Sequence, residues 1–180
     1  GDMLAKEAQR LSRQREATDI DPGTGLLLRG PFMARLGAKL ESEDADASGS
    51  IALVRLSNLA RLNQNFGRQT MDAVLTEIGN SMKRLNLDQS DWVAGRLNGS
   101  DFCLLAPLAS EPKLTAEMLQ RVIWEVLANF EMSEQTRLPS ACASYTSGHT
   151  IGQLMSALDG ALVVSDEQEE SEIIVANVAS

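Results

Sequence analysis

The chain has 180 residues, of which 43% are hydrophobic and 23% charged, a composition that fits one globular domain with a short extension and excludes a wholly disordered protein. Its 16 Lys and Arg against 25 Asp and Glu give a net charge of -9, which argues against broad electrostatic attraction to nucleic acid or anionic lipid. No segment approaches the roughly 20 apolar residues of a membrane span, and the N-terminus lacks the apolar centre of a signal peptide, so we expect a soluble chain.

The first predicted element is a helix at the N-terminus. Residues 3–17 contain neither Gly nor Pro, and Leu4, Ala8 and Leu11 share one face at helical spacing. Because this apolar stripe is too narrow to enter a large core, we expect the helix to pair with a second copy or with an upstream segment. The alternative is a frayed, solvated leader. The predicted organisation is a signalling or linker helix over 1–17 and one domain over 18–180.

From residue 19 onward, segments of helical periodicity alternate with short apolar segments typical of strands. In chain order they predict a helix at 32–40, a strand at 51–57, a short and a long helix between 59 and 87 with a break at Gly67, two strands between 91 and 107, a helix at 114–130, a strand at 138–145, a helix at 150–164 and a strand at 173–178. Asn98-Gly99 is the strongest hairpin signal. This order predicts an α+β fold of the ferredoxin-like type, with a central, mainly antiparallel sheet of about five strands flanked by helices.

Four segments match the motifs of one family in order and separation. They are DPGTGL at 21–26, LNQNFG at 62–67 followed by Asp72, RLNGSDF at 96–102 and ALDGAL at 157–162. The chain therefore resembles a GGDEF domain, which in active members condenses two GTP molecules into cyclic di-GMP. The resemblance covers residues 19 to about 176 and implies the nucleotidyl cyclase palm fold.

The resemblance also implies a Mg²⁺ site, because carboxylates must hold the hard cation that neutralises a triphosphate. At the end of the first strand, however, Arg55 and Ser57 stand where the family has an aspartate-containing D-x-D. In the RLNGSDF segment, Ser100 stands at the third position of the family's G-G-D-E-F signature, where the family has Asp or Glu. Asp101 is the surviving carboxylate. The positive charge of Arg55 would repel a metal ion, because two like charges ~4 Å apart cost roughly 4 kcal/mol per unit charge at an effective dielectric near 20. We therefore expect no metal and no catalytic residues.

Phosphate recognition departs from the family in the same direction. The family has two basic residues just beyond the last motif, and here Asp166 and Glu170 lie near those positions, while Ala60 replaces a family lysine after the first strand. Acids repel phosphate, so weak or absent GTP binding is expected. The alternative is that 166–172 is a solvated acidic connection. Asp91, in the segment where the family's product-binding R-x-x-D would lie, is interpreted as a turn residue, and an acid stands in place of the arginine.

The residues that hold guanine in the family are retained as Asn63 and Asp72, which the resemblance implies are vestigial guanine contacts. The alternative is that Asn63 caps or decorates a helix and that Asp72 lies in the first turn of the long helix, favoured by its dipole.

The remaining distinctive side chains are predicted to be structural. A single histidine, His149, lies in a turn without a second histidine for a catalytic or metal pair. Trp92 and Trp124 are predicted to pack in the core. Cys103 and Cys142 each lie in an apolar stretch, which indicates buried thiols in a reducing cytosol.

The leading hypothesis is a catalytically inactive GGDEF domain that relays signals between an upstream sensor or coiled coil and a C-terminal EAL domain, as in receptors of the LapD type. The alternatives are a weak diguanylate cyclase using Asp101, or a GTP-sensing domain using Asn63 and Asp72. We expect no cofactor, no nucleic acid partner and no direct membrane contact. We do expect a homodimer that forms through the N-terminal helix. The expected location is the cytoplasm, either free or as the cytoplasmic part of an inner-membrane protein.

Overall fold

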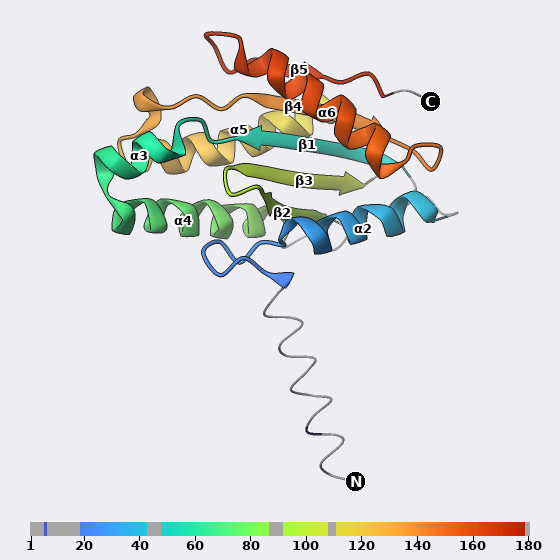
Figure 1. Ribbon diagram of the computed structural model, residues 1–180, viewed down its shortest axis with the longest axis horizontal. Helices are drawn as coiled ribbons and strands as arrows, with labels where there is room; N and C mark the ends of the chain where they lie inside the picture. Colours follow the sequence, from blue (N-terminus) through green and yellow to red (C-terminus); the bar gives the residue numbers. More distant parts are fainter. Residues whose placement is uncertain (1–5, 7–18, 43–47, 87–91, 108–110, 179–180) are drawn as a thin grey trace.

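The computed structural model describes residues 19–42, 48–86, 92–107 and 111–178, together with Lys6. The helix predicted over 1–17 lies outside the described residues apart from Lys6. The described chain forms a central sheet with helices on both faces (Figure 1). Its elements are α2 (Arg29–Glu41), β1 (Gly49–Arg55), α3 (Leu59–Phe66), α4 (Arg68–Asn86), β2 (Val93–Leu97), β3 (Asp101–Pro107), α5 (Pro112–Asn129), the short 3-10 helix η2 (Ser133–Gln135), β4 (Ser140–Tyr145), α6 (Ile151–Asp166) and β5 (Ile173–Val175).

The five strands lie in the order β2-β3-β1-β4-β5. β1 is antiparallel to both β3 and β4, β2 is antiparallel to β3, and β5 is parallel to β4. The chain therefore leaves β1, passes through α3 and α4, and returns as β2 with β3 in between. This arrangement is the split βαβ unit, and it confirms the predicted α+β fold with a mainly antiparallel sheet of five strands.

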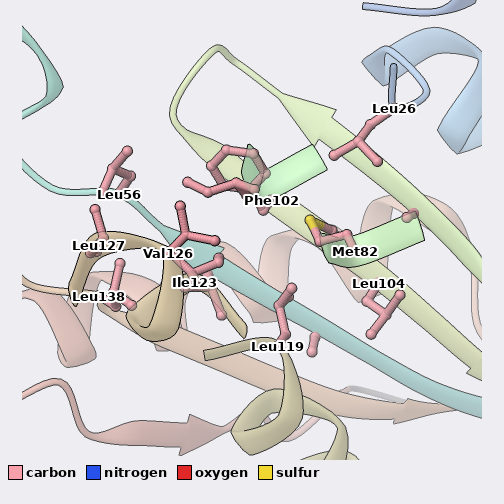
Figure 2. Close-up of a cluster of buried hydrophobic side chains, with 14 of the residues drawn as sticks. Leu26, Leu56, Met82, Phe102, Leu104, Leu119, Ile123, Val126, Leu127 and Leu138 are labelled. Carbon is pink, nitrogen blue, oxygen red and sulfur yellow. The ribbon is translucent and has the colours of Figure 1, made fainter. Parts of the chain in front are cut away.

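Two hydrophobic cores lie on opposite faces of the sheet, because successive residues of a strand point to opposite sides. Ala52 and Val54 of β1 belong to the core under α4 and α5, whereas Ile51 and Leu53 belong to the core under α2 and α6. Figure 2 shows the first core, where side chains of α5 point toward those of β3 and α4; its labelled members include Leu104, Phe102, Met82, Leu119, Ile123, Val126 and Leu127. Each fully buried side chain of this size contributes about 1.5–3 kcal/mol, so the cores fix the position of β1 firmly.

Several element boundaries differ from the predicted ones. α2 begins at Arg29 rather than 32, with Pro31 in its first turn, and α6 continues to Asp166 rather than 164. The first strand ends at Arg55, so Leu56 and Ser57 follow the strand. Within the described residues, no helix combines the length and apolarity needed to cross a bilayer.

Residues 19–28 form a strap that runs along the outer edge of β2. The N–H of Leu27 donates to the carbonyl of Ala94 at 3.3 Å, and the N–H of Arg96 donates to the carbonyl of Leu27 at 2.8 Å. On the α4 side, a Cβ added to Gly79 would lie 2.1 Å from the Thr24 carbonyl oxygen. The strap therefore packs directly on α4, where only glycine fits.

Candidate functional site

The candidate site lies where β1 ends beside the turn that joins β2 to β3. Asn98 and Gly99 in this turn have φ angles of 54° and 82°, a conformation that Asn and Gly adopt most readily. The N–H of Leu56 donates to the carbonyl of Ser100 at 2.8 Å. The predicted hairpin is therefore confirmed, and its turn is fastened to the residue that follows β1.

Arg55 and Asp101 lie opposite each other in the β1–β3 register and form a bidentate ion pair. Nε of Arg55 donates to Oδ1 of Asp101 at 2.8 Å, and Nη2 donates to Oδ2 at 3.1 Å. The Asp101 side chain is 4% exposed and that of Arg55 34%. The hydrogen bond with Asp101 raises the pKa of Arg55 despite its partial burial, and Asp166 and Asp159 act in the same direction. The two opposite charges therefore neutralise each other inside the site.

This donor set does not fit a divalent cation. Both oxygens of Asp101 already accept from a guanidinium, and the neighbouring positions that would need carboxylates carry Ser57 and Ser100. In the described part of the chain, no three His, Cys, Asp or Glu side chains gather into a group that could hold a metal. A Mg²⁺ ion here would lie beside a fixed positive charge without the oxygen ligands that it prefers.

Ser57 is held by the segment that precedes β4 rather than by the site. Its carbonyl accepts from Oγ1 of Thr136 at 2.8 Å and its N–H donates to the carbonyl of Arg137 at 3.1 Å. Ser57 is 6% exposed, so its position is determined by the fold. Ser100 is half-buried in the turn.

The acidic segment after α6 is anchored, and the sequence did not indicate this. Nη1 of Arg137 donates to the carbonyls of Asp166 and Gln168 at 3.0 and 2.7 Å, and Nη2 donates to Oδ1 of Asp166 at 3.2 Å. The side-chain amide of Gln120 donates to the carbonyl of Ser171 at 2.9 Å. The view of 166–172 as a merely solvated connection is therefore wrong for its backbone, although Glu170 is exposed. Arg137 and Gln120 belong to no motif that sequence reasoning could have singled out.

Asn63 and Asp72 lie on the outer surfaces of α3 and α4, and both are exposed. Gly67, with a φ of 85°, separates the two helices, and its N–H donates to the carbonyl of Asn63. Since α4 begins at Arg68, Asp72 falls in its second turn, and the expected placement in the first turn is wrong. The helix dipole therefore does not account for this aspartate. Ala60 is likewise exposed on α3.

A second ion pair joins the strap to the hairpin formed by β2 and β3. Nη1 of Arg96 donates to Oδ2 of Asp21 at 2.8 Å, and Nε of Arg96 donates to the carbonyl of Gly99 at 2.7 Å. Burial opposes ionisation of Asp21, but hydrogen bonds from Arg96 and from Thr24 outweigh it and lower its pKa. Oγ1 of Thr76 donates to the carbonyl of Gly23 at 2.8 Å. The DPGTGL and RLNGSDF motifs therefore meet in space.

The side chains predicted to be structural are placed as follows. Trp92 is buried and Trp124 half-buried against the first core. Cys103 and Cys142 are buried free thiols, as predicted, and burial raises the pKa of both, that of Cys142 to about 11. His149 lies in a turn, where its Nδ1 accepts from the N–H of Thr146. Asp91 lies outside the described residues.

Comparison with known proteins identifies the family. The family model described as diguanylate cyclase, GGDEF domain, matches residues 18–172. An uncharacterised protein of Streptomyces griseus is 27% identical over 84% of this chain and 61% of its own length, and the diguanylate cyclase DgcP of Pseudomonas aeruginosa is 31% identical over 56% of this chain and 15% of its own. The chain thus spans less than two thirds of the curated relatives that it matches. It belongs to the GGDEF domain family.

Solved structures share this fold. The coiled coil and GGDEF domain of DgcB from Caulobacter crescentus, in complex with c-di-GMP, matches with a TM-score of 0.78 at 19% identity, over 97% of this chain and 94% of that one. The S helix-GGDEF-EAL part of LapD from Vibrio cholerae matches with a TM-score of 0.72 at 22% identity, over 99% of this chain and 41% of that one.

Proposed function

We propose that this GGDEF domain does not condense GTP and that it acts as a regulatory, signal-relay module in cyclic di-GMP signalling. The observation that carries the proposal is the Arg55–Asp101 ion pair at the end of β1. In the family this position contributes carboxylates to the metal-dependent reaction. Here a guanidinium that is always charged occupies it and holds both oxygens of the surviving carboxylate.

The surroundings of the pair support the same proposal. Asp159 and Asp166 lie close enough to Arg55 to raise its pKa, so negative charge lies near the candidate site and would oppose a triphosphate there. Arg137 is a nearby cation, but it is engaged by Asp166 and by backbone carbonyls. A nucleotide without a cation to offset its phosphates binds weakly.

The partners that we propose are an upstream sensor or coiled coil and a C-terminal EAL domain, with the domain located in the cytoplasm. Support comes from the architecture of the similar proteins, since DgcB joins a coiled coil to its GGDEF domain and LapD joins an S helix, a GGDEF domain and an EAL domain. In the relay, the segment 1–17 would transmit changes in helix packing. Charged substitutions at Leu4 and Leu11 in the full-length protein should then change its output without lowering the stability of the domain.

The direct test is product chromatography with the purified protein, GTP and Mg²⁺ or Mn²⁺, alongside an active diguanylate cyclase. We expect no cyclic di-GMP above background. Cyclic di-GMP that increases in proportion to the amount of this protein would overturn the proposal and favour a weak cyclase that uses Asp101.

GTP sensing is a second candidate function, favoured by the exposure of Asn63 and Asp72, whose side chains remain accessible to a base. Calorimetry distinguishes it from the first. Absence of saturable heat at micromolar GTP agrees with the relay proposal, whereas tight binding that is lost in Asn63→Ala or Asp72→Ala would establish the sensor.

A further inference from the structure

A groove runs along the outer face of α5, away from the candidate site. It consists of two adjoining hollows of about 490 and 700 Å³ that share Gln120 and Trp124. The smaller one follows α5 from Glu117 to Ala128, and the larger one is walled by Arg137 and by the segment 169–172. We call the two together the α5 groove.

Trp124 is the apolar centre of the α5 groove. Its half-buried indole packs against the first core on one side and lines both hollows on the other. Ala128, one helical turn further on, continues this surface. A partly exposed tryptophan gives a docked peptide a large apolar contact and attracts cations to the face of its ring.

Carboxylates surround this apolar centre. Glutamates line both hollows, and none of them forms an ion pair with another described residue; they are Glu117, Glu125, Glu169, Glu170 and Glu172. Of the two arginines that line it, Arg137 is already paired with Asp166, which leaves Arg121. The groove therefore has excess negative charge around an apolar floor.

The carboxylates of the segment 169–172 stand on a fixed backbone. The carbonyl of Ser171 accepts from Gln120, and Oγ of Ser171 accepts from the N–H of Leu138 at 2.8 Å. Oγ of Ser165 donates to the carbonyl of Glu172. Because this backbone is already ordered, binding there loses less conformational entropy.

We propose that the α5 groove binds residues 3–17 of a second copy of this chain. This segment carries four basic residues against two acidic ones, and Leu4, Ala8 and Leu11 recur at helical spacing. Its apolar side chains would lie on Trp124 and Ala128, and its basic side chains would face the glutamates, a complementarity that gives both affinity and orientation. The proposal does not depend on whether the domain condenses GTP.

The distance across the sheet favours a second copy over the same chain. Residues 19–28 run along β2, whereas the larger hollow lies beside β5, at the other end of the strand order. Four strand spacings amount to about 19 Å. As a helix, the chain from residue 11 to residue 19 covers only about 12 Å. If the segment is helical, Leu11 therefore cannot reach this hollow of its own chain, and the stretch from Leu4 to Leu11 fits only the groove of another molecule.

The first test uses a peptide of residues 1–18 carrying a neutral fluorophore, titrated with the complete chain and followed by anisotropy. We expect saturable binding that weakens about tenfold between 0.05 and 0.5 M NaCl and about tenfold in a Glu169→Gln/Glu170→Gln variant. Trp124→Ala should weaken binding as well. A Glu41→Gln/Asp72→Asn variant, which removes the same charge from α2 and α4, is the matched control and should bind like the parent.

The second test measures self-association of the complete chain by sedimentation. We expect dimers whose dissociation constant rises in the Glu169→Gln/Glu170→Gln variant but not in the control variant. The proposal is overturned if the peptide does not saturate, if a scrambled peptide binds equally well, if both charge variants behave alike, or if the chain is monomeric at about 100 μM, well above the micromolar affinity of a modest peptide interface.

Discussion

Replacing Arg55 with methionine should destabilise the domain far more than an ordinary surface substitution. The change keeps the apolar stem of the side chain but leaves the carboxylate of Asp101, 4% exposed, without its two hydrogen-bond donors. Breaking a fully buried pair costs about 3–5 kcal/mol, and an exposed pair contributes about 0–1 kcal/mol. Because Arg55 is about one third exposed, water can enter its place, and we expect a loss of about 2–3 kcal/mol.

The measurement is urea unfolding of the complete chain, supported by thermal melting. For a domain of this size each kcal/mol shifts Tm by about 2–4 °C, so Arg55→Met should lower Tm by about 4–12 °C. Asp101→Asn should cost less, about 1 kcal/mol, because Arg55 reaches solvent. A double-mutant cycle with both changes should give a coupling free energy of about 1–2 kcal/mol.

The chain provides a matched control in Arg84, which pairs with Glu77 at 2.8 Å with side chains 61% and 42% exposed. Arg84→Met should cost no more than about 0.5 kcal/mol. If Arg55→Met cost no more than Arg84→Met, or if the coupling free energy were near zero, the ion pair would not stabilise the end of β1 and the reasoning would be refuted.

Burial opposes ionisation of Asp21, but hydrogen bonds outweigh it and lower the pKa of this carboxyl. The contribution of Asp21 to the free energy of unfolding is therefore complete above the unfolded-state pKa of about 4 and is lost as the pH falls through the folded-state pKa. Asp21→Asn should accordingly lower Tm at pH 7, with a gap that narrows toward pH 3. Gly79→Ala should cost about 2 kcal/mol or more in urea unfolding, because its Cβ meets the backbone of Thr24. Gly160→Ala, on α6 with nothing within 4 Å of its Cβ, should gain about 0.5–1 kcal/mol. Burial raises the pKa of Cys142 to about 11, so a thiol reagent at pH 8 should label it only in urea; rapid labelling of the native chain would contradict its burial.

Local signals in the sequence predicted the elements of the fold well. Asn98-Gly99 determines its own turn through positive φ angles, and the break at Gly67 separates α3 from α4 as expected. The ends of the elements were less well predicted. In α6, for example, the hydrophobic periodicity ends at 164, whereas the helix continues to Asp166. Asp166 is polar and yet helical, because Arg137 donates to both the carbonyl and the carboxylate of Asp166 at that helix end.

The pairings within the candidate site were not predictable from local sequence. The position of Arg55 indicated a cation in a carboxylate site, but its bond to Asp101 joins residues 46 apart and depends on the β1–β3 register. The Arg137–Asp166 pair likewise joins residues 29 apart. Such contacts follow from the packing of strands against helices, and no spacing in the sequence encodes them.

The two edge strands of the sheet, β2 and β5, are protected from pairing with other strands in different ways, and this affects aggregation. An uncovered, long edge strand is a template to which a foreign strand can add. At β2, the strap occupies the carbonyl of Ala94 and the N–H of Arg96, and at the opposite rim β5 has only three residues. A chain shortened to begin at Gly30 would uncover the β2 rim and is expected to precipitate during purification. The segment before α2 therefore prevents strands of other molecules from adding to the β2 edge.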